Sequence, residues 1–173
     1  EMFELALAEQ KMDEVVKRLE KLAEEQEAIV EELSKDEDMT TLASRERRQE
    51  ENFKTLEQAM KDAANAMEAL SPDASQQLSE LAESELTATT ASDLNEARTE
   101  MQSLDSSGSM KSGGQASSGL NEMLEIAQEI QSDFQADTVD EMLRKFLALI
   151  RNLLYISQEQ EKLVKETEGL RSR

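Results

Sequence analysis

The stretch that decides the fold lies at residues 139–170 and reads VDEMLRKFLALIRNLLYISQEQEKLVKETEGL. Its apolar side chains recur at alternating steps of four and three, which is the spacing of one face of a packed helix. A second apolar series lies one residue further round, so this face is wider than a two-helix interface needs. The pattern predicts a helix that packs against more than one neighbour. The first series is Met142, Phe146, Leu149, Leu153, Ile156, Gln160, Leu163, Thr167 and Leu170, and the second is Leu143, Leu147, Ile150 and Leu154.

Composition favours an all-α fold. The chain has 173 residues with one proline and five glycines, and four of these glycines lie between Gly108 and Gly119, so most of it is free of helix breakers. Aromatic residues make up only 3%, so Leu, Met and Ala at helical spacing must form the core. We expect an elongated antiparallel helical bundle with coiled-coil-like packing.

Residues 1–104 are predicted to form three long helices, at 1–34, 40–70 and 72–104. The first keeps a heptad pattern throughout, and the third begins at Ser71 as N-cap with Pro72 at the first helical position. Glu46 and Gln49 interrupt the apolar series of the second helix, which predicts weak packing in its first half. A polar run at 87–93 predicts a break in the third helix.

Residues 105–119, DSSGSMKSGGQASSG, have the composition of a flexible Gly/Ser linker. A short helix is expected at 120–134, followed by the long apolar helix at 139–170, which starts at a capping box formed by Thr138 and Glu141. We expect the region 120–173 to pack on the first part of the chain. The residues expected in this interface are Phe146, Leu149, Leu153, Ile156 and Leu163, opposite Leu19, Leu22 and Ile29.

Two glutamines, Gln26 and Gln160, each occupy an otherwise apolar helix face. A shift of 134 residues superimposes them and the apolar positions around them. A polar residue at such a position prefers a hydrogen-bonding partner and can therefore fix the register of helix pairing. The competing interpretations are that both lie near solvated helix ends, or that heptad sequences resemble one another by chance.

The net charge of −20 argues against nucleic-acid binding and against adsorption to anionic lipid. No apolar run approaches the roughly 20 residues that span a bilayer, so we expect no membrane insertion by this segment. The chain contains no His or Cys and no phosphate-binding glycine loop. We therefore predict no catalytic, metal or cofactor site and a protein that is not an enzyme.

Three segments resemble the coiled-coil part of a family of large bacterial envelope proteins of unknown function. They lie at 12–27, at 47–60 and at 142–163, and the last carries the most distinctive motif, formed by Leu153, Ser157, Gln160 and Glu161. Members of the family have membrane spans near the N-terminus and a long helical region. The resemblance implies an extracytoplasmic location, a chain cut from a longer protein, and no assigned activity.

We interpret the chain as a structural or protein-interaction module whose partner, or second copy, binds through apolar helix faces. One alternative is an acidic carrier or chaperone for a basic or unfolded client. Another is a signalling helical hairpin, which Pro72 and the predicted linker disfavour. The contact set of the carrier would be Met60, Met67, Met101, Met110 and Met123.

Overall fold

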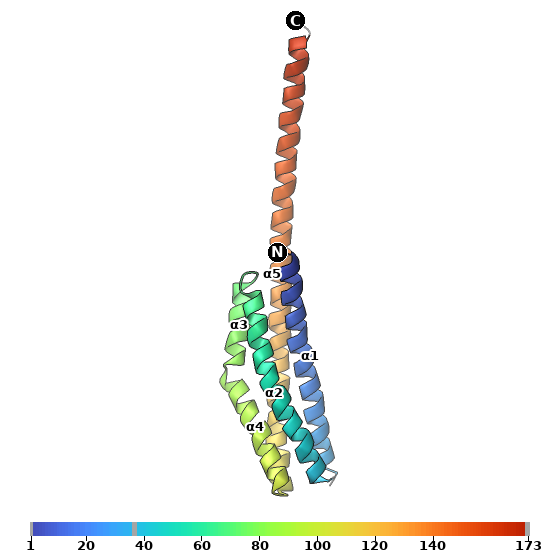
Figure 1. Cartoon of the computed structure of the whole chain (residues 1–173), viewed down its shortest axis with the longest axis vertical. Coiled ribbons are helices and arrows are strands. Elements are labelled where there is room, and N and C mark those ends of the chain that lie inside the picture. Colours follow the sequence, from blue (N-terminus) through green and yellow to red (C-terminus); the bar gives the residue numbers. More distant parts are fainter. Residues whose placement is uncertain (1, 36–37, 172–173) are drawn as a thin grey trace. The chain divides into compact units, whose positions relative to one another are not determined.

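The computed structural model describes residues 2–35 and 38–171, which are helical apart from short turns. The prediction of an all-α bundle is confirmed. The chain divides into two compact units, Glu1–Phe134 and Gln135–Arg173, and the last helix contributes to both. The helices are α1 (Met2–Leu33), α2 (Met39–Met67), α3 (Pro72–Ala82), α4 (Glu85–Gln102) and α5 (Ser106–Arg171), labelled in Figure 1.

The first unit is an antiparallel bundle, in which successive layers of helix run in opposite directions. Helices α1 and α2 fill two positions, α3 and α4 follow one another in the third, and the beginning of α5 fills the fourth (Figure 1). The predicted helices at 1–34 and 40–70 correspond to α1 and α2, although Glu1 and residues 36–37 lie outside the described part. Short connections between helices of similar length favour this antiparallel arrangement.

The third predicted helix is divided, but at Glu83 and Ser84, so the predicted break at 87–93 is wrong. The Ser84 side chain accepts a hydrogen bond from the amide of Thr87 at 3.1 Å and thereby caps α4. Thr87 is helical, and its hydroxyl donates to the carbonyl of Leu81 at 2.6 Å. The threonine, although it lowers helix propensity, thus adds a hydrogen bond to the Leu81 carbonyl at the end of α3, which also accepts from Ser84. The predicted cap at Ser71 and Pro72 is confirmed.

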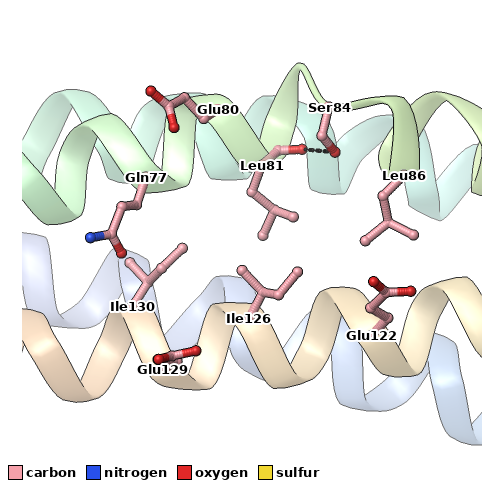
Figure 2. A pocket seen from close by; sticks show the side chains of 9 residues that line it. All are labelled: Gln77, Glu80, Leu81, Ser84, Leu86, Glu122, Ile126, Glu129 and Ile130. Carbon is pink, nitrogen blue, oxygen red and sulfur yellow. Dashed lines mark hydrogen bonds between the residues drawn. The ribbon is translucent and has the colours of Figure 1, made fainter.

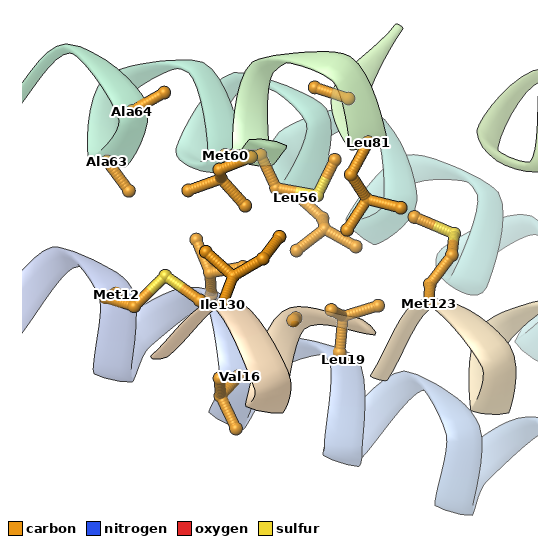
Figure 3. Packing of buried hydrophobic residues seen from close by; sticks show 14 of the residues in the cluster. Met12, Val16, Leu19, Leu56, Met60, Ala63, Ala64, Leu81, Met123 and Ile130 are labelled. Atoms are coloured by element: carbon orange, nitrogen blue, oxygen red, sulfur yellow. The ribbon is translucent and has the colours of Figure 1, made fainter. Parts of the chain in front are cut away.

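The core of the first unit combines side chains from all five helices. Figure 3 shows Met12 and Leu19 of α1 packed near Leu56 and Met60 of α2 and Met123 of α5. Leu19, Leu22 and Ile29, which the sequence placed in a helix interface, are at most 3% exposed. Met and Leu fill this core without a single tryptophan, because flexible thioethers and branched alkyl chains fill irregular space between helices.

The predicted flexible linker at 105–119 is wrong, because all but its first residue belong to α5. The Asp105 side chain accepts a hydrogen bond from the amide of Gly108 at 3.0 Å and caps the helix. A Cβ atom added to Gly119 would lie 2.2 Å from Oγ1 of Thr90, so α4 and α5 approach closely there. Small side chains permit this approach, and the burial of Ser109, Ser112 and Ala116 offsets the low helix propensity of the segment.

Helix α5 also continues through the predicted boundary between the short helix at 120–134 and the apolar helix at 139–170. The hydroxyl of Thr138 donates to the carbonyl of Gln135 at 3.0 Å, a bond typical of a helix interior. The predicted capping box of Thr138 and Glu141 is therefore wrong. Thr138 is compatible with the middle of a helix because its hydroxyl can bond to the preceding turn.

Candidate interaction surfaces

The second unit carries an exposed apolar surface on α5. Phe146, Leu149, Leu153, Ile156 and Leu163 are 52–60% exposed, so they do not form the buried core that their spacing predicted. A helical period identifies a face that requires a partner, but it does not identify the partner. Leu19, Leu22 and Ile29, the residues expected opposite them, are buried within the first unit. Whether the five exposed residues bind another molecule stays a prediction.

The exposed surface extends over both apolar series of the sequence. Ten large apolar side chains between 142 and 158 are exposed, and this stretch contains three basic residues and no acidic one. Contiguous exposed apolar patches of this kind mark interaction sites more often than ordinary solvated surface. The ten residues are Met142, Leu143, Phe146, Leu147, Leu149, Ile150, Leu153, Leu154, Tyr155 and Ile156.

A groove on the first unit has an apolar floor and an acidic rim (Figure 2). Leu81 and Leu86 point from α3 and α4 toward α5, and Ile126 and Ile130 point back from α5. The described residues that line it include no Lys or Arg. The rim carries Glu80, Glu122 and Glu129.

A buried polar cluster lies between α1 and α2. Gln26 is fully buried, and its Nε2 donates to Oε1 of Glu46, which is also fully buried, at 3.0 Å. Gln49 donates to the backbone carbonyl of Leu22 at 2.8 Å. The first half of α2 is therefore well packed, contrary to the prediction. Glu46 and Gln49 both form hydrogen bonds with α1. These bonds offset part of the free-energy cost of removing the polar groups from water.

The two glutamines predicted to fix register lie in different surroundings, and their role in register stays a prediction. Gln26 has a hydrogen-bonding partner at a buried position, as register-setting residues do, but the partner is Glu46. Gln160 is exposed. Sequence comparison of the two glutamines did not reveal Glu46, although Gln26 and Glu46 both interrupt apolar faces of consecutive antiparallel helices. This shared feature is the sequence signal that predicts a contact between Gln26 and Glu46.

Burial raises the pKa of Glu46 to about 7, since removal of the carboxyl from water disfavours its charged form. The hydrogen bond from Gln26 and the charge of Arg45 act in the opposite direction, and the charge of Glu50 adds to the increase. Arg45 is itself paired with Glu25 and Glu32 of α1. Burial therefore favours the neutral form of the Glu46 carboxyl within the bundle.

The methionines proposed as a carrier's contact set are mostly core residues. Met60, Met67, Met101 and Met123 are fully buried, and only Met110 is exposed. That set does not form a contact surface, because four of its members fill space between helices of the first unit. An acidic carrier would need a different site.

The described residues contain no cluster of three or more His, Cys, Asp or Glu side chains placed to hold a metal ion. None of the helices within 2–35 and 38–171 is long and apolar enough to cross a membrane. Comparisons with protein-family models, curated proteins and solved structures give no match.

Proposed function

We propose that this chain is a non-enzymatic structural and protein-interaction module, in which the exposed apolar face of the second unit binds another protein. The observation that carries the proposal is the exposure of ten large apolar side chains within 17 residues. Burial of apolar surface is favourable by roughly 25 cal/mol for each Å² removed from water. Binding of a partner helix or groove to this face would therefore be strongly favourable.

The two units differ in net charge. Residues 1–134 contain 12 basic and 32 acidic residues, whereas 135–173 contain seven of each. The acidic first unit keeps the module soluble and repels acidic proteins, and the neutral second unit presents apolar contacts without net repulsion. This difference in charge supports a scaffold whose exposed apolar helix binds a partner.

The test replaces Leu153 and Ile156 with Asp and follows molecular mass and binding of an apolar fluorescent dye in solution. We expect the variant to lose dye binding and any self-association while its first unit stays folded. The matched control, Ser157→Asp with Gln158→Asp, adds the same charge at exposed polar positions of the same helix. Equal dye binding and mass in all three proteins would overturn the proposal.

The resemblance to envelope proteins supports a wider proposal, that the module is part of a larger protein of the bacterial envelope on the periplasmic side. A tagged copy of the complete gene product, followed through cell fractionation, tests this. Recovery with the envelope is the expected result, and recovery in the cytosol contradicts it.

A second candidate, an acidic carrier for a basic client, is favoured by the groove between α3, α4 and α5. Three carboxylates surround its apolar floor, a combination suited to a cationic amphipathic segment. Such a carrier would release its client at high salt, because exposed charge pairs are screened. Salt-independent binding of clients would exclude it.

A further inference from the structure

The apolar stretch at 142–158 and the acidic groove of the first unit are complementary in charge. The stretch carries Arg144, Lys145 and Arg151 without any acidic residue, and the groove carries three glutamates without any basic residue among its described lining. An amphipathic helix with cations beside its apolar face fits a groove with anions beside its apolar floor.

The spacing of the charges also agrees. Glu122 and Glu129 lie seven residues apart on α5, and Arg144 and Arg151 lie seven residues apart on the exposed stretch. Seven residues are two helical turns, about 10.5 Å, so each pair lies on one helix face. Two helices side by side can therefore form both Arg–Glu contacts at once.

The four charged groups are available for such contacts. Arg144 and Arg151 are exposed, as are Glu122 and Glu129, and none forms an ion pair within the described part of the chain. Lys145 pairs with Glu141 at 2.8 Å in its own helix. Arg144 and Arg151 are therefore the two cations of the stretch that can pair with Glu122 and Glu129 of the groove.

The second apolar series lies beside these arginines. Leu147 lies three residues after Arg144, and Leu154 lies three residues after Arg151, a step that places each pair on one helix face. Leu143 and Ile150 lie four residues before these two leucines and extend the apolar series next to the arginines. All four are exposed. They match the leucines and isoleucines of the groove floor in chemistry, so one contact would bury both surfaces.

We propose that a second copy of this chain occupies the groove, with the stretch 142–158 of one copy docked between α3, α4 and the beginning of α5 of the next. The interface is heterologous, since the two surfaces differ, and it therefore generates chains or rings of copies rather than a symmetric dimer. The proposal rests on the proposed function, because it names the partner of the same apolar helix.

Sedimentation velocity of the whole chain tests the docking over a range of concentration and salt. The wild type should form oligomers that grow with concentration and dissociate at high salt. The variants E122R/E129R and R144E/R151E should each weaken association about tenfold, since two attractions become repulsions. An equimolar mixture of the two variants should regain wild-type association, because the reversed groove of one then matches the reversed stretch of the other.

The control E24R/E27R makes the same change of charge at exposed positions of α1 that do not line the groove, and it should associate as the wild type does. A wild type that stays monomeric at every concentration would refute the docking. So would a mixture of reversed variants that remains dissociated. Association lost in L153D/I156D but unchanged in both charge variants would retain the proposed function and overturn only the groove as the partner site.

Discussion

Gln26 Nε2 donates to Glu46 Oε1 at 3.0 Å, and the remaining oxygen of each side chain is buried without a hydrogen-bond partner among the described residues. Both remaining atoms are acceptors when Glu46 is ionised. When Glu46 is protonated, its hydroxyl becomes a donor, and the amide oxygen of Gln26 is an acceptor suited to it. A neutral acid and an amide can thus form two hydrogen bonds where an ionised acid forms one.

Glu46 should make the free energy of unfolding fall as pH rises. Its folded pKa of about 7 lies above the ordinary glutamate pKa of 4.5, so its contribution is fully present below pH 4.5 and is lost as pH rises through about 7. The shift corresponds to roughly 3 kcal/mol. Glu46→Gln keeps the two-bond geometry without a titrating group, so urea unfolding should show it to be more stable than wild type at pH 8.

The comparison of the two pH profiles isolates Glu46 from other carboxylates. Glu50, for example, has a lowered pKa because Lys54 and Arg98 bond to it, and its contribution changes in the opposite direction. Parallel profiles for wild type and Glu46→Gln between pH 4 and 8 would contradict a neutral Glu46.

Gly119→Ala should destabilise the first unit by about 1–3 kcal/mol, the usual effect of overpacking. The new Cβ would lie 2.2 Å from Oγ1 of Thr90, whose side chain is held by a hydrogen bond to the carbonyl of Leu86. Gly114→Ala is the matched control, because its Cβ meets nothing within 4 Å. It should stabilise the helix by up to about 1 kcal/mol. Equal effects in thermal unfolding would show that α4 and α5 are not in close contact.

Leu104→Gly should stabilise the turn between α4 and α5. Leu104 has φ of 60°, and the amide of Asp105 bonds to the carbonyl of Glu100 at 2.9 Å, which is the pattern of a Schellman motif. A left-handed conformation destabilises a non-glycine residue by about 1–2 kcal/mol, offset in part by the entropy of glycine in the unfolded chain. Chemical unfolding should show a gain of up to about 1 kcal/mol. A loss of stability would mean that the 70% exposed leucine makes a favourable contact.

Leu19→Ala and Leu153→Ala form a pair that separates core from surface. Leu19 is fully buried, so its truncation should destabilise the first unit by about 2–5 kcal/mol. Leu153 is 58% exposed, and its truncation should leave unfolding of dilute protein within about 0.5 kcal/mol of wild type. Similar losses for both variants would place residue 153 in the folding core.

Local sequence pattern predicted much of the first unit. The heptad spacing of 1–34, the proline after Ser71 and the apolar series of 120–134 act through contacts within one or two turns, so the helices and their buried faces follow from them. Residues 105–119 are helical despite their linker-like composition, because Gly and Ser lower helix propensity by only about 1 kcal/mol or less each and close packing against α4 outweighs that.

The candidate surfaces were only partly predictable. The apolar face at 142–158 was identified from sequence, but its exposure was not, because periodicity reports the need for burial and not the partner. The groove is not predictable from local pattern, because its floor combines Leu81 and Leu86 with Ile126 and Ile130, which lie 40–49 residues further along the chain. In the sequence Glu46 only interrupts the apolar face of α2, because its partner, Gln26 of α1, lies 20 residues away in the chain.

The sequence alone determined that this protein is helical, acidic and free of His and Cys, because those properties depend on composition and on spacing of three to four residues. Tertiary structure alone decided that the Gly/Ser segment is a close-packed helix, that Glu46 is buried beside Gln26, and that the most apolar stretch is exposed. These outcomes depend on which helices meet, and that is set by the summed burial of side chains distant in the chain.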